Sequence, residues 1–528
     1  MRSWRDLMVL GALVVGCGGP LSDEVSQEEV AEWVAPSEAA AGSEELAARV
    51  ERWEPGTARQ VKAFFSPSDV PAWMGEAPES LVAFRGKLAF AINRDGGLAG
   101  KELWLSDGTG TGTFAVKTFA PSADPFGPRD ALEGLTAAGT RLFFMVGDET
   151  HGPELWTSDG TSAGTQLVKD LTPGAEGSFL SGLTASGSTL LFFRYVPETH
   201  GSAERYELWK SDGTEAGTLR VKELGAGASL SSLRALVGST LFFVVSDPEH
   251  GTELWKSDGT QAGTLLVKDI YPGPEGAYPY HLRAVGSRLF FTAAAPSHGR
   301  ELWRSDGTAA GTVLVEDLQP GAESGSPQVL EALGKHLYFA THDEASHTLG
   351  LYRVRLDGTG RATRVRTLPN PYAGQPDAEP SITAVAVAGT RLFFGMAIST
   401  GGPAPRDVQL WATDGTAEGT RLLVRPLSLS DEFQSALFPV GDLVLFSAFE
   451  ERSHGLELWV SNGQPGGTRL LRDIAPGTAS AYPRGFTRVG DSVFFVAHDQ
   501  TDTNALWVLP LQRLEQHTVA ERPAPEAG

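Results

Sequence analysis

A short string, ELWKSDGT or a close variant, recurs along this chain at intervals of about fifty residues. The aromatic residue that ends each ELW marks the register, and these marks are Trp104, Trp156, Trp209, Trp255, Trp303, Tyr352, Trp411, Trp459 and Trp507. Successive marks are 46 to 59 residues apart. A period of this length is typical of propeller blades or of helical arrays.

Each period contains four short segments with strand character. In the second period they read LTAAG, RLFFMV, ELWTS and QLVKDL, and Gly- and Asp-rich turns separate them. Phe143 and Phe144 are neighbours, so they point to opposite faces of a strand, and both faces of the sheet are apolar. A sheet that is buried on both faces must lie between other sheets, as a propeller blade does. The sequence therefore predicts an all-β propeller.

The two ends of the repeat array are complementary. Residues 56–64 (GTARQVKAF) match the last strand of a repeat, whereas residues 485–509 supply the first three strands of a ninth unit and lack the fourth. We therefore predict one propeller of about nine four-stranded blades, closed when the N-terminal strand joins the last blade. Eight blades or an open arc stay as alternatives, because nine exceeds the usual range of about four to eight. Residues 510–520 could also supply a final strand.

The ELW, SDGT and GT elements resemble those of the bacterial ELWxxDGT repeat proteins. The likeness covers about residues 56–509, and the eighth copy departs from it with Asn462-Gly463-Gln464. The DGT turn is kept in seven copies, which begin at Asp107, Asp159, Asp212, Asp258, Asp306, Asp357 and Asp414. The resemblance implies a propeller-like scaffold in an envelope or secreted protein, and it carries over no catalytic residue.

The N-terminus has the features of a lipoprotein signal. Arg2 and Arg5 precede the apolar stretch LMVLGALVV, which is short for a membrane span and typical of a signal peptide. The stretch ends in VVGC, which resembles a bacterial lipobox, and its Cys17 is the single cysteine of the chain. We expect a diacylglycerol or acyl modification on Cys17. The alternative is an ordinary secretory signal in which Cys17 is incidental.

These features divide the chain into four parts. Residues 1–16 form the signal peptide, residues 17–55 an acidic flexible tether that can include a short helix, residues 56–512 the propeller, and residues 513–528 a disordered tail. Gly18 follows the cysteine, and by resemblance to diderm lipoproteins this favours the outer membrane of a bacterial envelope. Either face of that membrane fits the sequence.

The charge of the chain limits its partners. It carries 65 acidic and 43 basic residues, a formal net charge of −22. Nucleic acid binding needs a basic surface, so we expect no nucleic acid partner. We expect membrane contact only through the lipid anchor, and a monomer.

Two sets of polar residues are candidates for metal chemistry. Histidines before the ELW strand lie a blade width apart, too far to share one metal, so each should hold its own loop; they are His151, His200, His250, His298 and His454. A tighter group, His342, Asp343 and His347, gives weak metal candidates in the divergent sixth blade, where Glu344 also lies. Its spacing is not HExxH. We therefore expect no metal and no other cofactor.

The innermost strands provide the candidate ligand surface. Aligning LTAAG with its counterparts places one variable position at the channel wall, and this position is Thr136, Thr184, Arg234, Arg283, Glu331 or Thr487. We interpret Arg234, Arg283 and Glu331 as the candidate ligand surface. The alternative is a solvated channel wall.

No catalytic motif is present. The chain has no GxSxG, no P-loop and no thiol other than Cys17, so we assign no catalytic residues and lean against an enzyme. The sequence favours a lipid-anchored cell-envelope propeller that acts as a noncatalytic binding or scaffold module for an envelope protein or glycan. The alternative is an envelope polysaccharide or peptidoglycan hydrolase or lyase with its site in the central funnel.

Overall fold

The computed structural model describes residues 53–64, 76–94, 100–120, 131–148, 150–198, 203–375, 377–399, 407–425, 437–450, 454–499, 501 and 503–513. The predicted signal peptide, Cys17, most of the tether and residues 514–528 lie outside these ranges. The chain divides into two units, Met1–Ser37 and Glu38–Gly528, and the fold below belongs to the second. Every regular element in the described ranges is a strand, and no helix there is long and apolar enough to cross a membrane.

The first five blades follow one another along the chain, each with four strands. Blade 1 has β3 (Pro78–Phe84), β4 (Lys87–Arg94), β5 (Gly100–Ser106) and β6 (Phe114–Phe119); blade 2 has β7 (Glu133–Ala138), β8 (Arg141–Gly147), β9 (Pro153–Ser158) and β10 (Gln166–Lys169). Blade 3 has β11 (Phe179–Ser186), β12 (Thr189–Val196), β13 (Arg205–Ser211) and β14 (Leu219–Glu223). Blade 4 has β15 (Ser229–Val237), β16 (Thr240–Asp247), β17 (Gly251–Ser257) and β18 (Leu265–Lys268); blade 5 has β19 (Tyr280–Val285), β20 (Arg288–Ala295), β21 (Gly299–Ser305) and β22 (Val313–Glu316).

The remaining four blades keep this order, and the last is completed from the N-terminus. Blade 6 has β23 (Gln328–Leu333), β24 (His336–Asp343), β25 (Thr348–Arg355) and β26 (Thr363–Leu368); blade 7 has β27 (Pro380–Ala388), β28 (Arg391–Ile398), β29 (Asp407–Thr413) and β30 (Arg421–Val424). Blade 8 has β31 (Phe438–Val440), β32 (Leu443–Glu450), β33 (Gly455–Ser461) and β34 (Thr468–Arg472). Blade 9 has β35 (Arg484–Val489), β36 (Ser492–His498), β37 (Asn504–Arg513), β1 (Trp53–Pro55) and β2 (Arg59–Ala63).

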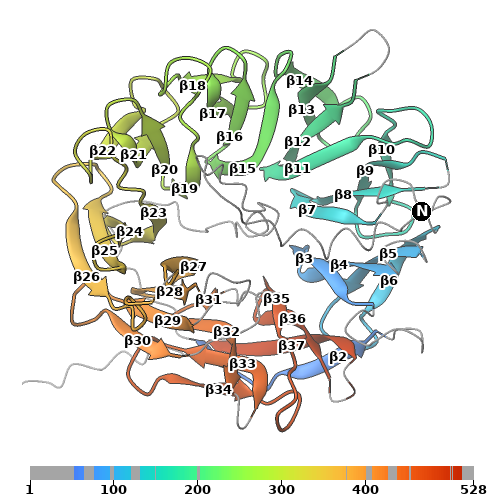
Figure 1. The fold of residues 1–528 in the computed structure, drawn as a ribbon. Coiled ribbons are helices and arrows are strands. Elements are labelled where there is room, and N and C mark those ends of the chain that lie inside the picture. Colours follow the sequence, from blue (N-terminus) through green and yellow to red (C-terminus); the bar gives the residue numbers. More distant parts are fainter. Residues whose placement is uncertain are drawn as a thin grey trace, which may run out of the picture. The chain divides into compact units, whose positions relative to one another are not determined.

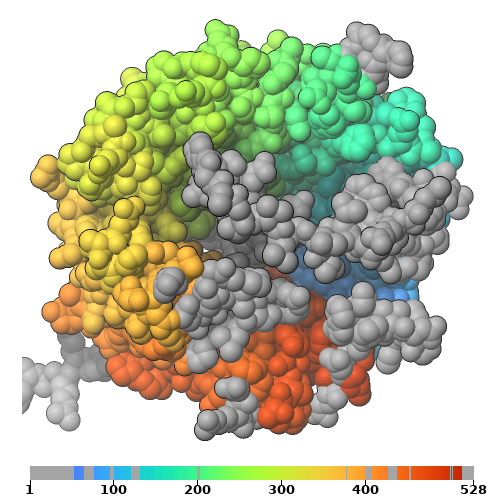
Figure 2. All heavy atoms as spheres, in the orientation of Figure 1, coloured from blue at the N-terminus to red at the C-terminus, as the bar shows by residue number. Residues whose placement is uncertain are grey.

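The nine antiparallel sheets form a propeller, with the first strand of each blade innermost (Figure 1). Neighbouring blades are in side-by-side contact in the space-filling view (Figure 2). The first and last blades meet where Thr487 on β35 donates its hydroxyl hydrogen bond to the carbonyl oxygen of Leu81 on β3, at 3.2 Å. The predicted propeller of nine four-stranded blades is confirmed.

The N-terminal strand closes the ring. Strand β2 pairs antiparallel with β37, with Gln60 opposite Trp507, and so occupies the fourth position of blade 9. Trp53–Pro55, which the sequence assigns to the tether, forms β1 and pairs with residues 511–513 of the same strand. Residues 510–513 therefore extend β37, and residues 514–520 lie outside the described residues. The eight-blade and open-arc alternatives do not hold.

Both faces of each blade are buried. In blade 2, Phe144 packs in a cluster with blade 1 and Phe143 packs in a cluster with blade 3, and neither side chain is exposed to solvent. Complete burial of one such side chain contributes about 1.5 to 3 kcal/mol. The neighbouring Phe residues thus bind each blade to the blades on either side, as the sequence predicts.

A repeated lysine also joins neighbouring blades. Lys222 of blade 3 places its Nζ 5.8 Å from the ring centroid of Trp255 in blade 4, and donates a hydrogen bond to the carbonyl oxygen of Thr264 at 2.6 Å. Lys268 makes the same two contacts with blade 5, to Trp303 at 5.6 Å and to Thr312 at 2.9 Å. The Trp of the ELW motif is therefore a contact between blades.

The Asp of the DGT turn has a structural role. Asp258 Oδ1 accepts hydrogen bonds from the backbone N–H of Thr260 at 2.9 Å and from its hydroxyl at 2.7 Å. The Thr260 hydroxyl oxygen in turn accepts the N–H of Gly263 at 3.0 Å. The two hydrogen bonds from Thr260 to Asp258 favour the charged carboxylate, so they lower the pKa of Asp258.

Candidate functional site

The Glu of the ELW motif is a buried structural group in four blades. These residues are Glu154, Glu253, Glu301 and Glu457, and none is exposed to solvent. Glu253 Oε1 accepts backbone N–H bonds from Ile270, Tyr271 and Ala277, at 3.2, 2.9 and 3.1 Å. The Glu therefore holds the chain segment that leads to the next blade, a role that the sequence analysis missed.

The loop histidines bond to nearby carboxylates, as the sequence predicts. His151 Nδ1 lies 2.9 Å from Asp148 Oδ1, and His250 Nδ1 lies 3.1 Å from Asp247 Oδ1. The equivalent pairs in blades 5 and 8 are His298 with Asp317 and His454 with Glu450. His200 lies outside the described residues. Each histidine thus stabilises its own loop or blade.

Blade 6 departs from this pattern in its loop between β24 and β25. The loop contains residues 344–347, one residue more than the three-residue loop 296–298 of blade 5. His347 has a φ of 49°, a left-handed conformation that is uncommon outside glycine. The buried Glu of the motif is also absent, because Gly350 occupies its position. The divergent loop is therefore strained at His347.

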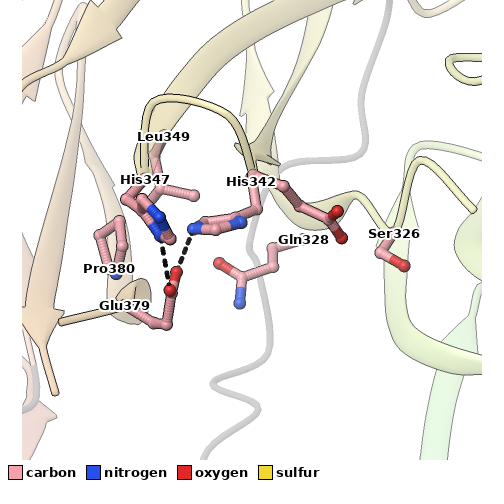
Figure 3. A pocket seen from close by; sticks show the side chains of 8 residues that line it. Ser326, Gln328, His342, His347, Leu349, Glu379 and Pro380 are labelled. Carbon is pink, nitrogen blue, oxygen red and sulfur yellow. Dashed lines mark hydrogen bonds and ion pairs between the residues drawn. The ribbon is translucent and has the colours of Figure 1, made fainter. Parts of the chain in front are cut away.

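A pocket of about 680 Å³ lies beside this loop. Its lining comes from the end of β24, the β24–β25 loop, the start of β25 and the segments that lead into β23 and β27, so it lies between blades 6 and 7 (Figure 3). The lining residues are Ser326, Gln328, His342, Glu344, His347, Leu349, Glu379 and Pro380. The pocket thus combines two imidazoles, two carboxylates, an amide, a hydroxyl and two apolar side chains.

One carboxylate joins the two imidazoles of the pocket. His347 Nδ1 lies 2.8 Å from Glu379 Oε1, and His342 Nε2 forms an ion pair with the other carboxylate oxygen (Figure 3). The two rings lie 6.4 Å apart. A hydrogen bond to one ring nitrogen of a neutral histidine leaves the other nitrogen as an acceptor. The hydrogen bond with Glu379 therefore leaves Nε2 of His347 as a potential base.

The structure brings together two of the three weak metal candidates. His342 and His347 both contact Glu379, whereas Asp343 Oδ1 instead accepts the backbone N–H of Ser346 at 3.1 Å and does not line the pocket. Among the described residues, no group of three or more His, Cys, Asp or Glu side chains is placed to hold a metal ion. Glu379 was missed because it is 32 residues from His347, in the segment that leads to blade 7.

The structure separates Arg234 from the other two residues of the candidate ligand surface, Arg283 and Glu331. Arg283 and Glu331 each lie two residues before the last paired residue of their inner strand, whereas Arg234 lies three residues before it. The guanidinium of Arg234 packs against Gly182 on β11 of blade 3. The alignment on one level is therefore wrong for Arg234, because β15 has one residue more in its bulge.

Comparisons with known proteins give matches only among solved structures. No protein-family model and no curated protein matches the chain. A puromycin-hydrolysing peptidase of Mycobacterium tuberculosis is 14% identical, with 83% of this chain and 62% of that chain covered and a TM-score of 0.39. A prolyl endopeptidase is 12% identical, with 74% and 55% covered and a TM-score of 0.39. An acylaminoacyl peptidase of Pyrococcus horikoshii is 12% identical, with 80% and 57% covered and a TM-score of 0.33.

These matches correct the prediction of function. The chain spans between 55 and 62% of the length of these three proteins. At 12 to 14% identity and TM-scores of 0.33 to 0.39, the likeness assigns no activity, substrate or partner to this chain. The matched structures are nevertheless those of peptidases, and against this comparison the prediction of a noncatalytic binding or scaffold module is wrong. Its alternative, a polysaccharide or peptidoglycan hydrolase or lyase, is not retained either.

Proposed function

We propose that the protein is a peptide-directed hydrolase whose acid–base site is the pocket between blades 6 and 7. The observation that carries the proposal is the pair of pocket-lining imidazoles bonded to the single carboxylate of Glu379. A peptide suits this pocket, because Gln328 offers amide hydrogen bonds beside the apolar side chains of Leu349 and Pro380. The volume of about 680 Å³ is in the usual range for small-molecule sites.

The arrangement supports water as the nucleophile. Figure 3 shows Ser326 apart from the group formed by His342, His347 and Glu379, so no Ser–His pair is formed. With Nδ1 bonded to Glu379, His347 has Nε2 available to accept a proton from a water molecule. The resulting hydroxide adds to the peptide carbonyl carbon, and the imidazolium returns the proton to the departing amine. Glu379 is a positioning residue that also stabilises the imidazolium.

The replacement His347→Asn is expected to lower kcat/KM at least about 100-fold, the usual contribution of a general base. Asn is chosen because it tolerates the left-handed backbone of this position. The measurement is the cleavage of a quenched-fluorescence peptide library by the full chain at pH 7. The matched control is His250→Asn, which removes the carboxylate-bonded loop histidine of blade 4 and should leave the rate unchanged.

Two results would overturn the proposal. One is that the wild-type protein cleaves no peptide of the library, and the other is that His347→Asn cleaves as fast as the wild type. Glu379→Gln tests the positioning role, since the loss of an orienting carboxylate should lower kcat and leave KM unchanged. A change in KM alone would assign Glu379 to substrate binding instead.

We also propose that this activity belongs to the bacterial cell envelope, at the outer membrane. The N-terminal sequence supports this, with its signal-peptide pattern and the lipobox-like VVGC that ends in Cys17. In a diderm host, Cys17→Ser is expected to move the protein from the membrane fraction to the soluble fraction, with loss of the acyl mass. An unchanged fractionation and an unchanged mature mass would show that Cys17 carries no anchor.

A further inference from the structure

A group of basic residues on blade 5 lies next to the pocket. It consists of His281 and Arg283 on β19 and Arg300 on β21, and we call it the blade-5 cationic cluster. The backbone carbonyl oxygen of Arg300 accepts the N–H of Ser326 at 3.0 Å, and Ser326 lines the pocket. The cluster is therefore adjacent to Ser326. In Figure 3, Ser326 lies on the side of the pocket opposite His347 and Glu379.

The backbone of His281 is strained. Its φ is 51°, in the bulge between Tyr280 and Arg283. The same bulge position in blades 2, 3 and 9 is a glycine, namely Gly134, Gly182 or Gly485. A left-handed non-glycine residue is uncommon, and such strain is concentrated at functional sites. The equivalent bulge position of blade 1 is also a non-glycine residue, Ser80, with a φ of 52°.

Two donor groups of the cluster have no acceptor. His281 Nδ1 is buried and makes no hydrogen bond within the part of the chain that the structure describes. In the same part of the chain the Arg283 guanidinium makes no hydrogen bond and no ion pair. Burial, together with the charges of Arg283 and Arg300, lowers the pKa of His281 to about 4, so its ring is neutral at pH 7. A neutral ring can still donate one N–H bond.

Two arginine side chains give the cluster its positive charges. Arg283 and Arg300 each carry a permanent charge, and Arg300 donates one N–H to the carbonyl oxygen of Tyr278 at 2.8 Å. The carboxyl group near Arg283 is that of Glu331 on β23, and burial raises its pKa in spite of the Arg283 charge. The Glu331 carboxyl group thus interacts electrostatically with Arg283, in a chain whose net charge is −22. An anionic ligand group would be attracted here rather than repelled.

We propose that the blade-5 cationic cluster is a binding subsite for a carboxylate group of the ligand. The guanidinium of Arg283 offers the planar pair of N–H donors that matches two carboxylate oxygens. His281 supplies a further donor from its Nδ1. The carboxylate comes from the C-terminus of a peptide or from an acidic side chain, and in either case the subsite rests on the proposed peptide substrate.

Three fluorescent tetrapeptides that differ only at the last residue test the subsite. One has a free C-terminus, one is C-terminally amidated, and one is amidated but ends in Glu. Their affinities for the full chain are measured by fluorescence anisotropy at pH 7, with His347→Asn as a second, non-cleaving form. We expect the free-acid peptide to bind at least about 10-fold more tightly than the amidated peptide. The amidated peptide lacks the charged carboxylate and so loses a hydrogen bond to a charged group. The Glu peptide shows whether a side-chain carboxylate substitutes.

The replacement Arg283→Gln locates the carboxylate. It should weaken binding of the free-acid peptide about 10-fold or more and leave the amide peptide unchanged. Arg234→Gln is the matched control, since Arg234 is also an inner-strand arginine but packs against Gly182 of the next blade. Equal affinity for acid and amide, equal weakening of both peptides by Arg283→Gln, or no binding of any peptide would each overturn the subsite.

The two proposals fail separately. Carboxylate-dependent binding without cleavage by the wild type would remove the hydrolase function and leave the subsite standing. Cleavage that is the same for acid and amide peptides, and that is unaffected by Arg283→Gln, would remove the subsite and leave the hydrolase function standing.

Discussion

A chain that begins at residue 65 is expected to lose the closed ring. It lacks β1 and β2, so the backbone groups of β37 that pair with them are left without partners. Trp53 and Ala58 are also removed from the cluster around Trp507, and Lys62 no longer lies over the Trp104 ring of blade 1, where its Nζ is 5.2 Å from the centroid. Packing within blade 9 and its contact with blade 1 are both weakened.

The expected size of this effect is a fall of about 10 °C or more in the thermal unfolding midpoint, because several kcal/mol of packing are lost. Circular dichroism and light scattering follow unfolding and self-association. The control is a chain that begins at residue 51 and keeps both strands. Addition of a synthetic peptide of residues 53–64 should reverse part of the fall in the thermal unfolding midpoint. Equal midpoints for the two chains would show that closure does not depend on the N-terminal strand.

The blade architecture was predictable because it depends on local patterns that repeat. Neighbouring Phe143 and Phe144 indicate a sheet with two buried faces, and the spacing of the ELW motifs gives the number of such sheets. Closure was predictable because residues 56–64 lack the strands that should precede them. These patterns are read along the sequence, with no need to know which blades touch.

The pocket was only partly predictable. His342 and His347 belong to the most divergent repeat, and their closeness in sequence made them visible. Glu379 comes from the segment that leads to blade 7, and it reaches His347 only because consecutive blades are adjacent in space. Nothing in its local sequence marks it as a partner. The site therefore depends on packing between blades, which sequence spacing does not give.

The error at Arg234 has a different cause. The alignment of inner strands was counted from a shared leucine, and in blade 4 the segment LRALVG has one residue more than LTAAG. In the structure the additional residue lies in the bulge between Leu230 and Arg234. Equivalent positions of the inner strands must therefore be counted back from the turn between β15 and β16. A shift of one residue moves a side chain to the other face of a strand. The corresponding bulge of blade 5, between Tyr280 and Arg283, contains His281 with its left-handed backbone, which the sequence did not reveal.

The replacement Glu253→Gln is expected to stabilise the protein at pH 8. Burial raises the pKa of Glu253 to about 7, three backbone N–H donors oppose the rise, and the negative charge of Asp269 adds to it. Glu253 Oε2 and Asp269 Oδ1 are both buried without a hydrogen-bond partner among the described residues. Gln keeps an oxygen for the three donors, removes the buried charge and offers an N–H group to satisfy an acceptor.

The pH dependence follows from the direction of the shift. The folded state holds the Glu253 proton up to about pH 7, whereas the unfolded chain releases it near 4.5. The folded state therefore binds more protons between these values, and its stability falls as pH rises through this window. A rise from 4.5 to about 7 corresponds to at most about 3 kcal/mol. Below pH 4.5 this contribution is fully present, and above pH 7 it is lost.

Thermal unfolding midpoints of the wild type and of Glu253→Gln between pH 5 and pH 8 measure this contribution. The wild-type midpoint should fall more steeply with pH than that of the variant. Glu207→Gln is the matched control, because Glu207 holds the same motif position in blade 3 but there burial is outweighed by hydrogen bonds from Trp209, Arg220 and Arg205, which lower its pKa. Glu207→Gln should thus destabilise the protein at pH 8. If Glu253→Gln destabilises it as well, the carboxylate of Glu253 is held charged by its three N–H donors.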